Sequence, residues 1–150
     1  MAYSSSADDA RERKVAKFVE SVSKGWNFHK FAGRFQPVDW YIINDIGRPI
    51  GWAEIKCRTI ASTEYSTIFF AVRKYMALMM HAMLTQQRGF FFVGYTDCVY
   101  YIDVYRIDMT TCKVIQGGRT RQYRSTNDIE PIILLPVSSM ILLKAKAKGQ

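Results

Sequence analysis

The N-terminal part of the chain carries a helical pattern of hydrophobic positions. Apolar residues recur at positions i, i+3, i+4 and i+7, as Val15, Phe18, Val19 and Val22. This spacing predicts an amphipathic helix with one apolar face. Asp8 and Asp9 suit its first turn, and Gly25 suits the position just beyond its end.

A hairpin is expected after this helix. Two runs of mainly apolar and β-branched residues, 38–43 and 51–58, flank a turn at 44–49 that is rich in Asn, Asp, Gly and Pro. This pattern is typical of two antiparallel strands joined by a short connection. If the turn is centred near Ile46-Gly47, the register places Asp39 opposite Glu54.

The segment from Ser66 to Gln87 contains neither glycine nor proline and carries a helical stripe of apolar residues. We therefore expect one long helix that is buried on much of its circumference and ends at Gly89. The methionines at 76, 79, 80 and 83 share this stripe. This placement favours core filling over a groove for a partner.

Short apolar runs predict further strands in the second half. Strands are expected at 90–95 and 99–107 with a turn at 96–98, and a basic segment, 113–124, has Gly117-Gly118 as a loop tip. Another apolar stretch lies at 132–136. The order αββαββ predicts an α/β (α+β) fold with a mixed central sheet flanked by helices. We expect residues 1–150 to form this single domain, with 1–7 as a flexible arm and 144–150 as a basic tail.

The charge of the chain favours a polyanionic partner. The 150 residues include 21 Lys and Arg against 13 Asp and Glu, a formal net charge of +8. Residues 110–150 alone carry seven basic and two acidic side chains. Nucleic acid is the first partner that this balance predicts, and an anionic membrane surface is the second. Because acids are spread among the lysines of the first helix, we expect DNA binding and no membrane association.

The cysteines and the N-terminus bear on the compartment. Three widely spaced cysteines without a Cys-x-x-Cys pair predict neither a disulfide framework nor a zinc ribbon. No apolar leader is present, and no apolar run approaches the ~18 residues of a membrane span. We therefore expect a cytoplasmic protein, in the host cell cytoplasm if the chain is viral. The glycine-rich loops of nucleotide hydrolases and dinucleotide-binding proteins are also absent from the sequence.

The hairpin carries the strongest chemical signal. Asp39 is expected opposite Glu54, and the period of a strand places Lys56 on the same face as Glu54. Two carboxylates a few ångströms apart supply the oxygen ligands that Mg²⁺ prefers. The adjacent ammonium group can orient a water molecule or stabilise charge on a phosphate. The alternative is an exposed hairpin whose charges form cross-strand ion pairs.

These residues resemble a known family. Pro37-Val38-Asp39, followed by Glu54-Ile55-Lys56, resembles the motif of the PD-(D/E)xK nuclease superfamily, and the order of the flanking helices is similar. Val38, between the proline and the aspartate, departs from the pattern. The resemblance implies a restriction-endonuclease-like core and a Mg²⁺ cofactor, for which Mn²⁺ substitutes. It also implies Asp39, Glu54 and the Ile55 carbonyl as metal ligands, and Asp39, Glu54 and Lys56 as catalytic residues.

The same family supplies a glutamate from the first helix, for which Glu12 and Glu20 compete. On a helical wheel Glu12 falls about 70° from the centre of the apolar stripe, and Glu20 about 150°. Residues 12–21 also resemble the corresponding helix of phage-type Holliday-junction-resolving endonucleases, in which a glutamate at the position of Glu12 belongs to the active site. We therefore expect Glu12 to be catalytic. The alternative is a solvated glutamate favoured by the helix dipole.

Basic residues give candidate DNA contacts. In the superfamily a basic side chain from the long helix often approaches the site, and Lys74 matches this role better than Arg73. The alternative for Lys74 is a lysine at the rim of a buried helix. Around the Gly117-Gly118 tip, basic and aromatic side chains can clamp phosphates and stack on a base, with a solvated loop as the alternative. The candidates there are Lys113, Arg119, Arg121, Tyr123 and Arg124.

The sequence thus predicts a Mg²⁺-dependent DNA endonuclease that hydrolyses phosphodiester bonds. Small size and basicity suggest a phage or mobile-element enzyme. We expect resolution of four-way junctions by a homodimer, because the cuts in a junction are two-fold symmetric. One alternative is another nuclease of the superfamily: an exonuclease, or a nicking or restriction-type enzyme. The other is a non-catalytic DNA-binding protein on the same fold, with steeply salt-dependent binding.

Overall fold

A computed structural model describes residues 6–31, 37–118 and 129–145. The described residues form two α-helices, α1 (Ser6–Val22) and α2 (Val72–Thr85), and short 3-10 helices at Val104–Arg106 and Val137–Ser139. The strands are β1 (Asn27–Lys30), β2 (Trp40–Ile43), β3 (Pro49–Cys57), β4 (Thr67–Ala71), β5 (Arg88–Gly94), β6 (Cys98–Asp103), β7 (Lys113–Gly118), β8 (Ile129–Pro136) and β9 (Ile141–Ala145).

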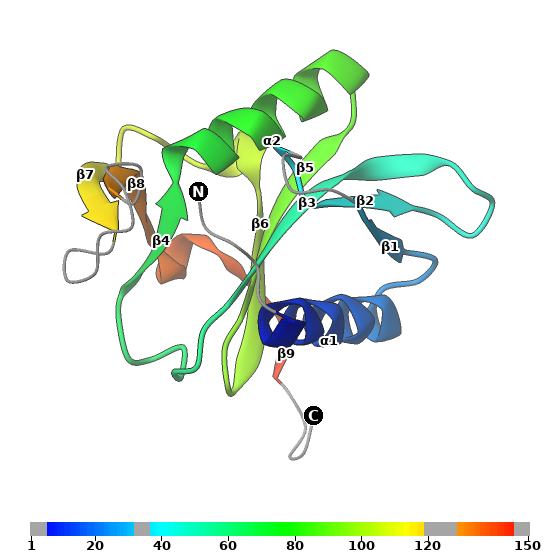
Figure 1. Ribbon diagram of the computed structural model, residues 1–150, viewed down its shortest axis with the longest axis horizontal. Coiled ribbons are helices and arrows are strands. Elements are labelled where there is room, and N and C mark those ends of the chain that lie inside the picture. Colours follow the sequence, from blue (N-terminus) through cyan, green and yellow to red (C-terminus); the bar gives the residue numbers. More distant parts are fainter. Residues whose placement is uncertain (1–5, 32–36, 119–128, 146–150) are drawn as a thin grey trace.

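The larger of two sheets is mixed and lies between the helices. Its strand order is β1-β2-β3-β5-β6-β9. The β3 and β5 strands are parallel, whereas the other neighbours are antiparallel. Figure 1 shows α1 and α2 on opposite sides of this sheet. The predicted mixed sheet flanked by helices is therefore confirmed.

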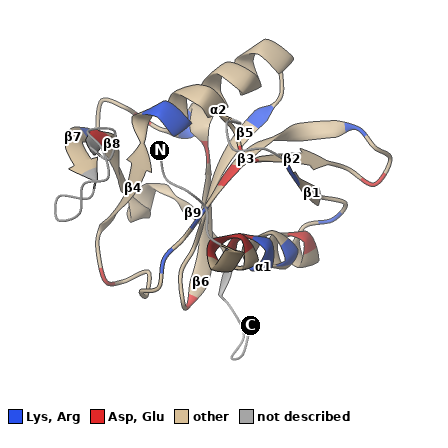
Figure 2. Ribbon diagram, viewed as in Figure 1, with Lys and Arg blue, Asp and Glu red and all other residues tan. Residues whose placement is uncertain are grey.

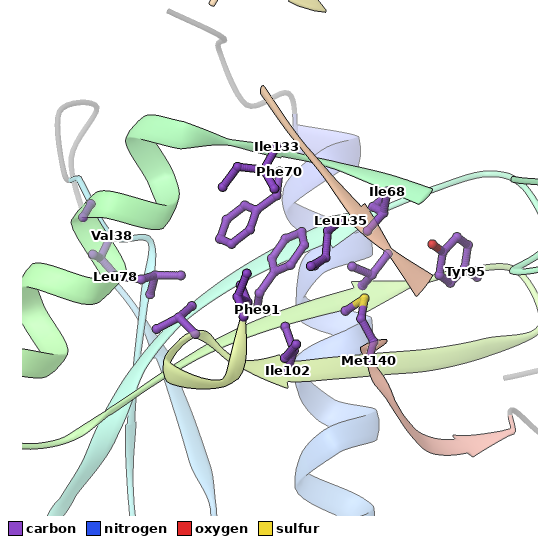
Figure 3. Packing of buried hydrophobic residues seen from close by; sticks show 14 of the residues in the cluster. Val38, Ile68, Phe70, Leu78, Phe91, Tyr95, Ile102, Ile133, Leu135 and Met140 are labelled. Atoms are coloured by element: carbon purple, nitrogen blue, oxygen red, sulfur yellow. The ribbon is translucent and has the colours of Figure 1, made fainter. Parts of the chain in front are cut away.

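Alternating side chains of the central strands pack into two cores. Ala53, Ile55 and Phe92 point to the face that α1 covers. Phe91 and Val93 point to the face that α2 covers. The rings of Phe91 and Phe70 stack there, with their centroids 3.9 Å apart (Figure 3). Burial on both faces gives β3 and β5 a strong preference for the centre of the sheet.

The long helix predicted from Ser66 to Gln87, with its end at Gly89, is wrong at both ends. Residues Thr67–Ala71 form β4, and the helix begins at Val72. It ends at Thr85, because Gln86 adopts the left-handed conformation, and Gly89 lies in β5. Within β4, Ile68 and Phe70 are buried while Phe69 is 42% exposed, which is the alternation of a strand. Pairing with β8 in the smaller antiparallel sheet, β4-β8-β7, outweighs the helical pattern.

The prediction that the α2 methionines fill the core is also wrong for three of the four. Met76, Met80 and Met83 are 61%, 53% and 61% exposed, whereas Met79 packs against the core. The sheet-facing side of α2 is made by Ala77, Leu78 and Ala82. The small alanines let the helix lie close to the sheet, so its opposite face is left to solvent.

Further boundaries differ from the predicted ones. The β1 strand, absent from the prediction, forms where backbone pairing with β2 is available. Gly117-Gly118 ends β7 instead of forming a loop tip, because both residues pair with β8. The helix α1 begins at Ser6, within the expected arm, and β9 includes residues 144–145 of the expected tail through pairing with β6. The predicted strand at 99–107 ends at Asp103, whose side chain caps the 3-10 helix.

No helix among the described residues is long and apolar enough to cross a membrane.

Candidate active site

The β2–β3 hairpin positions the two predicted carboxylates. Its turn is fixed by Asn44, whose Oδ1 accepts hydrogen bonds from the backbone N–H groups of Ile46 and Arg48. Gly47 adopts the left-handed conformation that this turn requires, at φ 80°. The register pairs Trp40 with Ala53. Asp39 immediately precedes this pair and Glu54 immediately follows it, so the predicted register is confirmed.

A lysine from α2 lies between these carboxylates. The Lys74 Nζ atom is 3.3 Å from both carboxylate oxygens of Asp39 and 3.3 Å from Glu54 Oε2. Figure 2 shows the basic first turn of α2 and the acidic position on β3. The predicted approach of Lys74 to the site is what the structure shows. One positive charge is thus shared by two acids.

Glu54 is the most perturbed acid of the group. Its side chain is 14% exposed. Burial is the main reason that its pKa is raised to about 8; the Lys74 charge opposes this rise and the Asp39 charge adds to it. Lys74 is within ion-pair distance of Oε2, yet this oxygen has no hydrogen-bond partner among the described residues. A buried carboxylate oxygen without a donor is suited to bind a cation.

Glu12 lies beside this pair on α1. Its Oε1 accepts a hydrogen bond of 3.1 Å from the indole N–H of Trp40 and is 3.6 Å from Lys30 Nζ. Burial raises the pKa of Glu12, the Trp40 and Lys30 contacts oppose this, and the charge of Asp39 adds to it. Glu20 instead accepts a hydrogen bond from the backbone N–H of Phe28. Of the two competing glutamates, Glu12 is therefore the one near the hairpin acids.

Lys56 is on the predicted face but makes a different contact. Its Nζ donates a 2.9 Å hydrogen bond to the Phe69 carbonyl oxygen, in β4. Within the described part of the chain it forms no ion pair with Asp39 or Glu54; the structure brings Lys74 to them instead. Burial lowers the pKa of Lys56, and the nearby Arg58 charge lowers it further. A lowered pKa increases the fraction of this amine that is neutral, and only the neutral form can accept a proton.

The predicted DNA contacts divide into three groups. Arg73 points to the smaller sheet, where its Nε donates to Glu130 at 2.7 Å, so it does not join the acidic pair. Lys113 is exposed at the start of β7. The remaining candidates, Arg119, Arg121, Tyr123 and Arg124, lie outside the described residues. Ile55 has a buried side chain, and a ligand role for its carbonyl stays a prediction.

Trp40 and Lys30 around Glu12 were missed by the sequence analysis. Trp40 is 1% exposed and directly follows Asp39. A buried indole N–H generally requires an acceptor, so this residue was a signal that a hydrogen-bond acceptor lies nearby. Lys30 also bonds Asp9 and lies 5.5 Å from the centre of the Trp40 ring. No signal pointed to Lys30, because β1 itself was not predicted.

The site offers a limited but suitable set of metal ligands. No three His, Cys, Asp or Glu side chains are grouped as metal ligands in residues 6–31, 37–118 and 129–145. Asp39 and Glu54 supply two carboxylates. The Glu54 oxygen that accepts no hydrogen bond among the described residues, together with the Lys74 ammonium beside it, marks a place for positive charge. Mg²⁺ is commonly bound through one or two carboxylates, with water and phosphate completing its shell. The residues present fit such an ion.

The comparisons with known proteins agree with this geometry. A family described as "Phage putative PDDEXK endonuclease" matches residues 1–142. No curated protein matches the sequence. The mixed sheet between two helices is also that of the restriction-endonuclease-like fold. With nearly its whole length matched, the chain belongs to this family of phage endonucleases within the PD-(D/E)xK superfamily.

Proposed function

We propose that this chain is a Mg²⁺-dependent DNA endonuclease that acts on branched DNA such as a four-way junction. Membership of the endonuclease family supports phosphodiester cleavage. The observation that carries the metal dependence is the Asp39 and Glu54 pair, which shares one ammonium group and includes a buried oxygen that accepts no hydrogen bond among the described residues. The net charge of +8 supports a DNA substrate.

In this proposal each residue has a distinct role. Asp39, Glu54 and the Ile55 carbonyl would hold Mg²⁺ or Mn²⁺, which when bound supplies a more acidic water and neutralises phosphate charge. Lys74 forms ion pairs with both acids and offsets part of their charge, and its ammonium group would contact a phosphate oxygen of the substrate. Lys56 accepts a proton at Nζ or stabilises charge on the phosphate. Glu12 acts next to them as the third acid.

The branched substrate and the homodimer have a separate basis. Residues 12–21 resemble the helix of junction-resolving endonucleases, and this helix carries Glu12 next to the hairpin acids. Two symmetric cuts across a junction require two sites related by a two-fold axis, which a homodimer supplies. The protein is expected to act in the cytoplasm of the phage host.

The test is cleavage of an end-labelled four-way junction and of its matched linear duplex, with Mg²⁺ or with EDTA. We expect symmetric cuts in the junction alone, abolished by EDTA and by Asp39→Asn. The matched control is Asp45→Asn, which makes the same change at the exposed turn of the same hairpin and should cleave like wild type.

Other results would change the assignment. Cleavage of both DNAs would overturn the branched substrate and leave the metal site in place. Cleavage in EDTA would overturn the metal dependence. Binding without cleavage would favour the second candidate, a DNA-binding protein without activity, which the contact of Lys56 with Phe69 also supports.

A further inference from the structure

A concave surface lies beside the candidate site. It is a pocket of about 570 Å³ between α1 and the C-terminal ends of β3 and β5. Small-molecule sites in proteins commonly measure ~300–1,000 Å³. We call it the α1 pocket. It includes Arg11, which directly precedes Glu12, and Arg58, which follows Lys56 by two residues, so the two sites share α1 and β3.

The rim of the α1 pocket is cationic. Arg11, Lys14, Lys17 and Arg58 line it, and no acidic residue does. Lys14 and Lys17 are exposed on α1, and within the described part of the chain neither forms an ion pair. Arg11 is paired with Asp8 at 2.6 Å. The surplus of positive charge favours an anionic ligand.

The floor of the α1 pocket is apolar and partly aromatic. Phe18 is half-buried on α1, and Tyr95, which directly follows β5, is buried. Beneath them, α1 lies so close to the sheet that a Cβ on Gly94 would be 2.5 Å from Val15 Cγ2. A ligand that suits this pocket therefore has a flat apolar part as well as negative charge. A nucleotide has both.

Backbone hydrogen bonds fix one wall of the pocket. The Arg58 N–H donates to the Gly94 carbonyl at 2.9 Å, and the Thr96 N–H donates to the Ile60 carbonyl at 3.1 Å. These bonds join the segments that follow β3 and β5. A site whose walls are fixed before binding loses less conformational entropy when its ligand arrives.

We propose that the α1 pocket binds an unpaired nucleotide of the DNA strand, with its phosphates at Lys14, Lys17 and Arg58 and its base against Phe18. The inference rests on the proposed function, because that function supplies the DNA. It goes further by giving the enzyme a contact for an unpaired base. Stacking on an aromatic ring accepts any base, so the pocket would recognise DNA structure rather than sequence.

The first test measures binding without cleavage. A fluorescein-labelled single-stranded oligodeoxynucleotide of about 12 nucleotides is titrated with the full chain in EDTA at several salt concentrations, with anisotropy as the readout. For the Lys14→Ser/Lys17→Ser variant we expect affinity to fall about tenfold, and the slope of log K against log salt to decrease by about 1.4. The matched control is Lys24→Ser/Arg48→Ser, which removes two exposed cations outside the pocket.

The second test reports on the pocket itself. Cys57 lines the pocket and is half-buried, as is Cys112, which lies elsewhere. Alkylation of each cysteine by iodoacetamide is followed by peptide mass spectrometry. Saturating oligonucleotide should slow the labelling of Cys57 several-fold and leave that of Cys112 unchanged. Equal rates with and without oligonucleotide, or protection by inorganic phosphate alone, would overturn the proposal.

The two proposals can fail separately. If the Lys14→Ser/Lys17→Ser variant binds like its control while Asp39→Asn abolishes cleavage, the proposal of nucleotide binding in the pocket is wrong and the proposed nuclease activity is supported. If Cys57 is protected and the lysine variant loses affinity, but no DNA is cleaved, the pocket stands and the enzymatic activity is wrong.

Discussion

At the scale of single residues, the main feature of the site is two largely buried acids with one neighbouring ammonium group. Asp39 and Glu54 lie close enough that one ammonium group, from Lys74, serves both. Removing two carboxylates from water is costly, and one cation offsets only part of the cost. The protein resolves this by favouring the protonated form of Glu54. The acid that would bind the metal is therefore also a source of pH dependence.

The raised pKa of Glu54 makes a prediction about stability in the absence of metal. With a folded-state pKa of about 8 against an ordinary value of 4.5, the folded protein binds this proton more tightly than the unfolded chain does. The contribution of this protonated carboxyl group to the free energy of unfolding is complete below about pH 4.5 and is lost as the pH rises through about 8. Between pH 6 and 9 we expect the free energy of unfolding of wild type in EDTA to fall by roughly 3 kcal/mol because of this group.

Denaturant unfolding of Glu54→Gln across the same pH range checks this prediction. The neutral amide should remove most of the loss. The control is Glu64→Gln, an exposed glutamate in the segment after β3, which should follow wild type. A loss of the same size in Glu54→Gln and in wild type would contradict the explanation.

At the scale of elements, the site depends on how closely α1 approaches the sheet. Val15, Ala16 and Val19 are buried against β3 and β5, and Gly94 leaves the room that Val15 occupies. The same approach brings Glu12 within hydrogen-bond distance of Trp40. It also places Phe18 of α1 in the lining of the α1 pocket. One contact between a helix and a strand therefore sets the geometry of both sites.

This contact can be tested with Gly94→Ala. The added methyl group would meet Val15 Cγ2 at 2.5 Å, so the Val15 side chain must rotate, the helix must shift or the strand must bend. We expect a loss of about 1–3 kcal/mol in the free energy of unfolding. Adding Val15→Ala should recover part of the loss, because it removes the atoms that collide. A double variant that is less stable by the sum of the two single effects would contradict this account.

The elements also show what the sequence allowed us to predict. The hairpin was predicted with its register because a turn rich in Asn and Gly and two short strands are local features. The β4 strand was predicted as helix because Ile68 also falls on the helical stripe that continues at Val72, and only pairing with the distant β8 decides for a strand. The β1 strand likewise depends on its pairing with β2.

At the scale of the whole molecule, candidate residues were easier to select from the sequence than their contacts. Asp39, Glu54, Lys56 and Glu12 were all selected from spacing and resemblance, and their catalytic roles stay predictions. The contact of Lys56 with Phe69 was not, because it requires β4, which the sequence analysis had assigned to a helix. For the same reason, the pairing of Arg73 with Glu130 of β8 was not foreseen. Side chains that join the two sheets are visible only once both sheets are known.

The exposed methionines of α2 have a consequence for the chemical durability of the protein. Oxidation to the sulfoxide makes methionine polar, which is tolerated at the surface and disruptive in a core. Met76, Met80 and Met83 are more than half exposed, whereas Met140 is 7% exposed. Under mild peroxide, peptide mass spectrometry should find the three surface residues oxidised well before Met140, while circular dichroism stays unchanged. Equal rates at all four positions would contradict this order. If the surface methionines are oxidised first, as expected, the outer face of α2 consumes the oxidant before the oxidant reaches the core.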